Sequence, residues 1–426
     1  MVHPQPGRGP RLLFCSYHCY MDPSSGAAVA TCDLLELLAG SGWPCGVFSG
    51  PQLDYEHGES LEQLLSDYRI QPEVRQGSST APFTVYHFVQ GGLPVSVYDT
   101  PNVRPLQPPS RDQGMPFLSL FEQVLDKFRP DLLLTYGGHW LAHEVIASAK
   151  RRGIRVVFAL YNFAYGDASF FRPVDAVLVP SRFSQCYYQR TLGLQSTAIP
   201  CALNWSRVQC PVVEGKYVTF VNPQPIKGVF LFARLAHELG RLRPDIPLLV
   251  KEGRAKADWL GRTDVDLSGQ SNLYSMAHTP DPREFYRVSR LVLMPSLWLE
   301  SFGRVAAEAC LNGIPVLASR RGALPETLAE AGFLFDVAER YTPDSRLVPS
   351  AAEVAPWVET ITRLWDDPSL YEQERRRCLA AAEAWRPERL LPRYQEFFSK
   401  VCRNQGVRGQ GSGVSNARPS LLTPDP

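Results

Sequence analysis

Cysteine is scarce in this sequence, and its spacing carries no paired motif. Ten of the 426 residues are cysteine, well below the roughly 8 to 10% that marks a disulfide-stabilised scaffold. No two of them stand in a CxxC arrangement. A disulfide framework is therefore excluded, and we predict that the cysteines are reduced thiols in the core.

Long apolar runs are also missing. The opening sequence, MVHPQPGRGPRLLFCSY, lacks the apolar segment of a signal peptide. Nowhere do about eighteen apolar residues follow one another, as a bilayer-spanning helix requires. The sequence argues against a transmembrane protein. We expect a cytoplasmic protein, for which a peripheral membrane contact stays open.

Neither sign of charge predominates. The chain has 44 basic and 43 acidic residues and a formal net charge of +1. It therefore has no global field of the kind that draws a protein to nucleic acid, and we expect a small or neutral partner instead. The GxGxxG fingerprint is absent as well, which argues against a dinucleotide-dependent oxidoreductase.

Short apolar runs alternate with amphipathic stretches through the first half of the chain. The runs cover residues 11–16, 45–49, 131–137, 155–160 and 175–181. Continuous apolar runs separated by helices indicate a parallel sheet that is covered on both faces. Residues 83–99 depart from this rhythm, because two alternating runs flank Gly91 and Gly92, and they predict an inserted β-hairpin.

The same rhythm restarts after residues 201–215. We therefore predict an α/β protein with two Rossmann-like doubly wound domains, residues 11–200 and 216–384, which face each other across a cleft and are joined by a hinge at 201–215. Residues 385–402 predict a helix that crosses back to the first domain. The polar, Gly/Pro/Ser-rich ends, 1–10 and 403–426, predict disordered tails.

The densest chemical signal is the segment MPSLWLESFGRVAAEACLNGIPVLASRRGALPE, residues 294–326. It places Glu300 and Glu308 around a helix start whose first free amides belong to Ser301, Phe302, Gly303 and Arg304. Such amides can bind a phosphate group. Carboxylates beside them are explained if each accepts hydrogen bonds from the hydroxyls of a flanking sugar or ribose. Eight helical residues span about 12 Å, enough to straddle a diphosphate. The alternative is a solvated carboxylate at Glu308 and a dipole-complementing charge at Glu300.

This segment resembles the Glu-x7-Glu signature of the retaining nucleotide-sugar glycosyltransferases of the GT-B fold, family four, a glycogen-synthase-like group. The matching residues are Pro295, Ser296, Glu300, Phe302, Gly303, Glu308, Ala309, Gly313, Pro315, Val316, Gly322 and Glu326. The similarity extends more weakly over about residues 11–402. It implies that Glu300 contacts hydroxyls of the donor sugar, that Glu308 contacts the ribose, and that the amides of residues 301–304 hold the distal phosphate and sugar.

The family also carries an Arg and, five residues later, a Lys that together neutralise the donor diphosphate. In FVNPQPIKG, Lys227 matches the Lys, whereas Asn222 occupies the Arg position and brings no charge. Arg254 and Arg304 are the candidates for the missing cation. The alternatives are ordinary surface arginines and, for Lys227, a solvated lysine at a helix start.

In the first domain, Gly26 resembles the second glycine of the family's Gly-Gly turn, and Ser25 replaces the first. A turn of small residues lets the backbone approach the donor phosphates. His139 follows a strand end and resembles the family's histidine near the donor sugar. A helix-capping or core histidine and a metal site with His143 are the alternatives. The HxxxH pair lacks the HExxH order and a third ligand, so we expect no metal.

Aromatic side chains concentrate in the first half of the chain, where they fit either a platform for an acceptor sugar or an ordinary core. They are Tyr17, Tyr20, Tyr86, Phe88, Tyr98, Trp140 and Tyr161. By resemblance, the first domain would bind the acceptor and the second the nucleotide sugar.

The resemblance implies a hexosyltransferase whose donor is a nucleoside diphosphate sugar and whose acceptor is a carbohydrate or small molecule. Transfer would retain the anomeric configuration and need no metal or other cofactor. We assign catalytic roles to His139, Lys227 and Glu300. Donor-binding roles fall to Gly26, Asn222, Arg254, Ser301, Phe302, Gly303, Arg304 and Glu308. Two alternatives stay open: a nucleotide-sugar epimerase of the same fold, and a non-catalytic nucleotide-sugar-binding protein, which Asn222 and Ser25 suggest.

Overall fold

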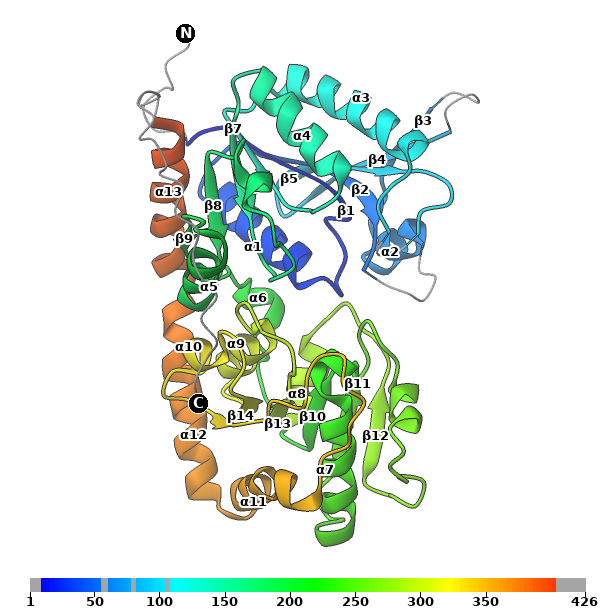
Figure 1. Cartoon of the computed structure of the whole chain (residues 1–426), viewed down its shortest axis with the longest axis vertical. Helices are drawn as coiled ribbons and strands as arrows, with labels where there is room; N and C mark the ends of the chain where they lie inside the picture. The colour runs from blue at the N-terminus through cyan, green and yellow to red at the C-terminus, as the bar shows by residue number, and fades with distance from the viewer. Residues whose placement is uncertain (1–8, 55–59, 78–81, 105–106, 404–426) are drawn as a thin grey trace, which may run out of the picture.

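The computed structural model of the chain describes residues 9–54, 60–77, 82–104 and 107–403, and it contains two β-sheets with their helices, one above the other in Figure 1. The predicted tails fall mostly on residues 1–8 and 404–426, which lie outside the described residues. Arg403, predicted to be in the tail, is instead the last residue of a helix. No helix in the described ranges is long and apolar enough to cross a bilayer.

The first sheet has nine strands in the order β3-β4-β5-β2-β1-β6-β7-β8-β9. Seven adjacent strands run parallel to one another: β1 (Leu12–His18), β2 (Cys45–Gln52), β5 (Leu93–Asp99), β6 (Leu132–Thr135), β7 (Arg155–Ala159), β8 (Ala176–Val179) and β9 (Thr197–Ala198). At one edge, β3 (Glu73–Gln76) and β4 (Thr84–Gln90) pair antiparallel, and β4 and β5 form a hairpin around Gly91 and Gly92. Both glycines have positive φ, which this turn requires.

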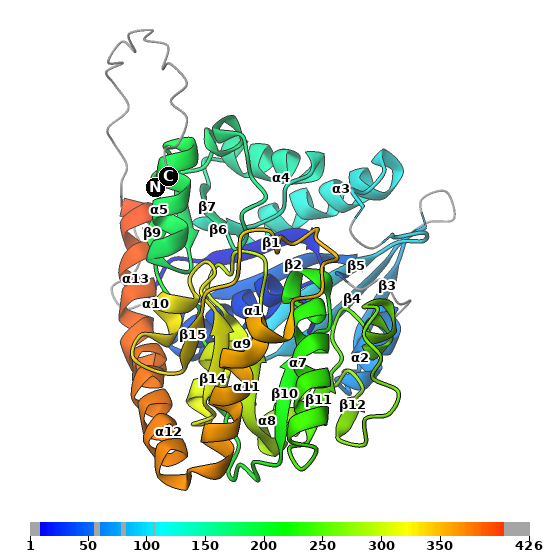
Figure 2. The same cartoon turned by 60° about the horizontal axis from the view of Figure 1, so that its bottom comes forward.

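Helices cover both faces of the first sheet. Helices α3 (Arg111–Phe128) and α4 (Trp140–Arg151) lie on one face, and α1 (Gly26–Gly40) lies on the other (Figures 1 and 2). Helices α2 (Leu61–Asp67) and α5 (Arg182–Leu192) and the short 3-10 helix η1 (Ala168–Phe171) complete this domain. Because both faces are covered, the inner strands are continuous apolar runs, as predicted.

The second sheet is parallel throughout, in the order β12-β11-β10-β13-β14-β15. Its strands are β10 (Tyr217–Val221), β11 (Leu248–Lys251), β12 (Leu273–Met276), β13 (Ser289–Met294), β14 (Val316–Ser319) and β15 (Phe333–Phe335). Helices α7 (Val229–Leu242) and α11 (Ala351–Asp366) pack together in one core cluster. The other elements are α8 (Arg283–Val288), α9 (Arg304–Leu311), α10 (Leu324–Leu328) and α12 (Pro368–Ala382), with 3-10 helices η2 (Pro225–Lys227) and η3 (Ala257–Arg262). The predicted class, two Rossmann-like α/β domains, is confirmed.

The chain returns to the first domain at its end. After α12 and η4 (Glu383–Trp385), α13 (Pro387–Arg403) runs along the first sheet (Figure 1). The Tyr394 hydroxyl donates to the carbonyl of Pro200 at 2.6 Å, and the Phe398 ring lies 6.3 Å from that of Trp43. Between the two sheets, residues 201–215 contain α6 (Trp205–Val208) and bury Cys201. This connection is therefore packed.

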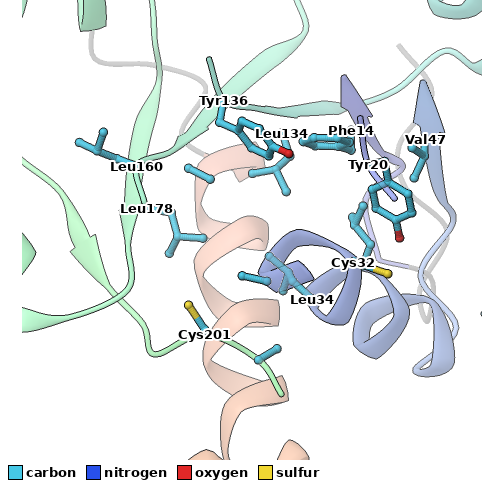
Figure 3. Packing of buried hydrophobic residues seen from close by; sticks show 14 of the residues in the cluster. Phe14, Tyr20, Cys32, Leu34, Val47, Leu134, Tyr136, Leu160, Leu178 and Cys201 are labelled. Carbon is cyan, nitrogen blue, oxygen red and sulfur yellow. The ribbon is translucent and has the colours of Figure 1, made fainter. Parts of the chain in front are cut away.

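The larger core joins the first sheet to its helices. Figure 3 shows Phe14, Leu134 and Leu178, from three strands, gathered around Leu34 of α1, and all four side chains are buried. All ten cysteines are free thiols, and eight are buried. The prediction of core thiols is wrong for Cys186, which is exposed because it lies on the outer face of α5.

Candidate functional site

Lys227 and Glu300 form an ion pair at the carboxyl ends of two neighbouring strands. Lys227 ends η2, which follows β10, and Glu300 follows β13. Lys227 Nζ lies 2.6 Å from Glu300 Oε1, and the Ser296 hydroxyl donates to the same oxygen at 2.7 Å. Burial raises the pKa of Glu300, but the charge of Lys227 and these hydrogen bonds outweigh it, so the pKa lies below its usual value. The site thus holds a charged carboxylate against a lysine.

Two glycines shape the loop that carries Glu300. Gly303 and Gly322 both have positive φ. A Cβ placed at Gly322 would lie 2.3 Å from the carbonyl oxygen of Glu300, so only glycine lets these two loops approach. The amide of Ala323 then donates to that carbonyl at 2.7 Å. This close approach fixes the backbone on which Glu300 stands.

Helix α9 begins at Arg304, later than the sequence suggested, so Ser301 and Phe302 precede the helix. Ser301 contacts the first domain: its hydroxyl donates to the carbonyl of Tyr161 at 2.5 Å, and its carbonyl accepts from Ser181 Oγ at 2.6 Å. The Phe302 ring is buried, with its centroid 6.0 Å from the Trp385 ring. Gly303 occupies the position that caps α9. Ser301 and Phe302 therefore help to join the domains.

Glu308 is buried, which rules out a solvated helix carboxylate. Arg304 Nε lies 2.6 Å from its Oε1, and the Tyr286 hydroxyl donates to its Oε2 at 2.8 Å. Burial raises the pKa of Glu308, and Arg304 and Tyr286 offset this only in part. Glu308 is thus held in one orientation from two sides.

Arg304 is turned toward the first domain. Its guanidinium forms an ion pair with Asp33 of α1 and donates to the carbonyl of Ala202 at 3.2 Å. Asp33 also faces Arg207, at 3.4 Å. The sequence offered Arg304 as a replacement for the diphosphate cation, whereas in this structure all its partners belong to a buried ionic network at the domain junction.

Arg254, the other candidate cation, also reaches the first domain. Its Nε donates to the carbonyl of Ser24 at 3.0 Å, and one terminal nitrogen lies 2.5 Å from Asp54 Oδ2. Arg254 follows β11, whereas Ser24 and Asp54 follow β1 and β2. Together with the contacts of Ser301, this shows that the carboxyl ends of the two sheets face each other.

Asn222 has a structural role that the sequence did not reveal. Its φ is +62°, in the left-handed region that asparagine tolerates better than most residues. Its Oδ1 accepts from the amide of Ala255 at 3.2 Å, and its Nδ2 donates to Gln224 at 3.3 Å. The side chain thereby ties the loop after β11 to the loop after β10, at the position where the resemblance implies an arginine.

Gly26 begins α1 and is exposed, and a Cβ placed there would meet no atom within 4 Å. The turn before it is held by Asp22, which sequence reasoning missed. The buried Asp22 carboxylate accepts from the amide of Ser24 at 2.8 Å and from the amide of Asp54 at 2.7 Å. The motif DPSS, with serine two residues after aspartate, is the signal that could have identified this turn.

His139 occupies the residue before α4, but its side chain makes no capping bond. Its ring lies 5.9 Å from that of Tyr17 and 5.8 Å from that of His18, and in the described part of the chain neither ring nitrogen has a hydrogen-bond partner. Burial, with smaller effects from His18 and His143, lowers its pKa to about 4, so the ring is neutral near pH 7. His139 is thus the N-cap residue of α4 by position, but its imidazole does not cap the helix.

The metal alternative gains no support from geometry. The His143 ring packs at 4.5 Å from that of Phe170. Within the described ranges, no group of three or more His, Cys, Asp or Glu side chains is arranged to hold a metal ion.

A hollow of about 880 Å³ opens in the first domain, next to the start of α3. Tyr17, the aromatic neighbour of His139, lines one wall, and Arg104 and Arg111 stand among the other lining residues. Four of the seven aromatics considered for a sugar platform are buried in the core, namely Tyr17, Tyr20, Tyr86 and Tyr98.

Glu326, a motif residue without an assigned role, binds the first domain. Its two carboxylate oxygens accept from the amides of Arg182 and Phe183, each at 2.9 Å. These amides begin α5, where a helix has free donors and a positive end. The serine at position 181, which starts that helix, was the available signal for such a site.

The comparisons with known proteins agree with this geometry. Residues 213–383 match the family model described as "Glycosyl transferases group 1". The matched part of the chain, which is less than half of its length, is similar to this family. It contains Asn222, Lys227, Arg254, Glu300 and Glu308.

Sequence relatives match part of this chain. A lipopolysaccharide 1,2-N-acetylglucosaminetransferase of Salmonella typhimurium is 28% identical over 193 residues, which is 40% of this chain and 50% of the relative. A D-inositol 3-phosphate glycosyltransferase of an Arthrobacter species is 30% identical over 177 residues, 38% of each chain. The chain thus spans half or less of the length of these curated relatives.

Solved structures share the whole architecture. Anabaena Alr3699/HepE, crystallised with UDP and glucose, superposes with a TM-score of 0.64 at 17% identity and covers 92% of this chain and 99% of its own. A glycosyltransferase from Rickettsia africae superposes with a TM-score of 0.63 at 14% identity. The match covers 93% of this chain and 100% of that protein's chain. The fold is therefore that of the GT-B glycosyltransferases, as predicted.

Proposed function

We propose that this protein is a glycosyltransferase that moves a hexosyl group from a nucleoside diphosphate sugar to a carbohydrate or small-molecule acceptor, with retention of configuration and without a metal ion. The observation that carries the proposal is the pair of Lys227 and Glu300 at the junction of two Rossmann-like domains. A lysine beside a charged carboxylate can exchange that partner for a diphosphate when a donor binds.

The chemistry follows from where charge develops. As the bond between the anomeric carbon and the diphosphate oxygen breaks, negative charge grows on the leaving group, and the Lys227 ammonium would stabilise it. Glu300, released from Lys227, would accept hydrogen bonds from donor-sugar hydroxyls. The acceptor oxygen would attack on the same face, and its proton would pass to the departing phosphate oxygen.

Other residues would hold the remaining parts of the donor. The free amides around Gly303 and Arg304, at the start of α9, would bind the distal phosphate, and the start of α1 at Gly26 would approach it from the first domain. Glu308, oriented by Arg304 and Tyr286, would accept ribose hydroxyls. His139 would contact the donor sugar as a neutral imidazole, and the hollow beside Tyr17 would take the acceptor.

The names of relatives support this class of reaction. They include an N-acetylglucosaminetransferase and inositol phosphate glycosyltransferases, and one structural neighbour was crystallised with UDP and glucose.

Donor turnover is the direct test. The purified protein should release nucleoside diphosphate from at least one of a panel of UDP-, GDP-, ADP- and dTDP-sugars when an acceptor panel is present. EDTA should leave the rate unchanged, and NMR of the product should show the donor's anomeric configuration. Turnover of the donor without an acceptor, giving an epimerised sugar, would instead indicate an epimerase, and binding without any turnover would leave only a nucleotide-sugar-binding protein.

A further inference from the structure

Lys251 is a buried cation, and within the described residues it forms no ion pair. Asp33, Glu238, Glu300, Glu308 and Glu374 are buried too, and each forms an ion pair. Lys251 is 6% exposed, and within the described residues no carboxylate lies within 4 Å of it. A buried ammonium without a counter-charge is unfavourable unless something else supplies acceptors.

The surroundings of Lys251 leave its ammonium incompletely bonded. Its Nζ lies 3.2 Å from Nδ1 of His278 and 5.7 Å from the centre of the Phe285 ring. An ammonium has three N–H donors, and an aromatic ring face is a weak partner for one of them. The imidazole therefore orients the ammonium, and donors remain for a ligand.

The place of Lys251 in the sheet identifies that ligand. Lys251 ends β11 and His278 follows β12, whereas Lys227 and Glu300 follow β10 and β13. The strand order β12-β11-β10-β13 puts Lys251 on the far side of Lys227 from Glu300. Lys251 also lies near the candidate ribose site, because the Phe285 ring that faces its ammonium packs at 4.0 Å from the ring of Tyr286, whose hydroxyl donates to Glu308. If the ribose lies at Glu308, the base that it carries is within reach of Lys251.

We propose that Lys251, positioned by His278, donates a hydrogen bond to a carbonyl oxygen of the donor's base, and so selects uracil, thymine or guanine over adenine. An ammonium can only donate, and adenine presents no carbonyl oxygen. This inference rests on the proposed function and adds the class of base to it. Lys251 acts as a specificity residue, and His278 acts through it.

The electrostatics of the site agree with this role. Burial lowers the pKa of Lys251 to about 8, although Glu252, Glu284 and Glu308 raise it in part. The side chain is therefore still mostly protonated at neutral pH. A carbonyl oxygen is uncharged, so it can accept a hydrogen bond from the Lys251 side chain even when part of the population is deprotonated.

Calorimetry with UDP, GDP, ADP and inorganic pyrophosphate tests the proposal. The wild-type protein should bind UDP or GDP more tightly than ADP. Lys251→Met keeps the apolar stem of the side chain and removes its N–H donors. It should lower the affinity for the preferred nucleotide by about 10- to 100-fold. It should change ADP and pyrophosphate by less than about twofold. His278→Ala should reduce the same preference by a smaller factor.

Lys256→Met is the matched control, because Lys256 is exposed on the same loop and should have no effect. An equal loss of affinity for ADP, UDP and pyrophosphate in Lys251→Met would overturn the inference, because it would mean that the ammonium contacts the phosphates. Unchanged affinity for every nucleotide would also overturn it. In both cases the proposed function would survive, whereas a wild-type protein that binds no nucleotide at all would defeat both. A melting curve of each variant separates loss of binding from loss of folding.

Discussion

Arg304 and Asp33 form a buried ion pair that joins the two domains, although 271 positions separate them in the sequence. Asp33 is 3% exposed, and Arg304 also holds Glu308. Removing one member of a buried pair leaves the other charge uncompensated, which costs about 3 to 5 kcal/mol. The pair therefore links the candidate ribose site to the first domain.

Arg304→Met should lower stability by several kcal/mol and should also weaken nucleotide binding, because Glu308 loses one of its two orienting partners. Urea unfolding and calorimetry measure the two effects. The double variant Asp33→Asn, Arg304→Met should lose less unfolding free energy than the sum of the losses in the two single variants. Arg262→Met, which breaks an exposed pair with Asp258, should change stability by less than about 1 kcal/mol. Additive losses in the double variant would mean that the two side chains do not interact.

Lys227→Ala should reduce kcat by roughly 10² to 10³, the scale seen when one group that stabilises transition-state charge is lost. The effect on KM should be smaller, because the charge that Lys227 stabilises is greatest in the transition state. Steady-state kinetics with the best donor give both constants. Lys216→Ala, an exposed lysine of the same domain, serves as control. A pure KM effect would reduce Lys227 to a ground-state binding residue.

Asn222→Arg should not improve activity, even though the resemblance implies an arginine at this position. The left-handed backbone at Asn222 disfavours arginine by roughly 1 to 2 kcal/mol, and the bond to the amide of Ala255 would be lost. We expect a lower melting temperature and a lower kcat. Asn222→Gly keeps the backbone free and should lose only the side-chain bonds. A faster Asn222→Arg enzyme would show that the site simply lacks charge.

Glu326→Ala should loosen the contact between the second domain and α5. Loss of a carboxylate that accepts from the amides of Arg182 and Phe183 should cost about 0.5 to 2 kcal/mol, as for other helix-capping side chains. Small-angle scattering should then show a more extended molecule in the absence of nucleotide. Glu330→Ala, an exposed change nearby, should leave the curve unaltered. Identical curves for Glu326→Ala and wild type would show that the other junction contacts suffice.

His139 should make stability depend on pH between about 4 and 6.5. Its pKa is lowered to about 4 in the fold, mainly by burial, from 6.5 in the unfolded chain. In this window the unfolded chain binds more protons, so stability falls as pH falls, by up to about 3 kcal/mol. His139→Gln should flatten this part of the profile relative to wild type. Parallel profiles would mean that the imidazole titrates normally in the fold.

Local signals in the sequence were enough for the architecture. The apolar runs that become β1, β6 and β13 have the length and continuity of buried parallel strands, and this requirement is met within a few residues of chain. Glycines at 303 and 322, spaced around Glu300, likewise follow from local backbone needs. The resemblance assigned Lys227 and Glu300 to one donor site, but their ion pair was not predicted.

Long-range pairing was decided by the tertiary structure alone. The sequence shows Arg254 and Arg304 as two spare cations, but the fold directs both to carboxylates of the first domain, Asp54 and Asp33. In the sequence, Lys251 is an ordinary lysine at a strand end, and only the fold shows that it is buried away from solvent. The partner of each charged side chain depends on how the two domains pack against each other. The periodicity and spacing of residues within one segment contain no information about that packing. The sequence therefore determined the elements and the motif, and the packing of the domains determined the partners of each charged side chain.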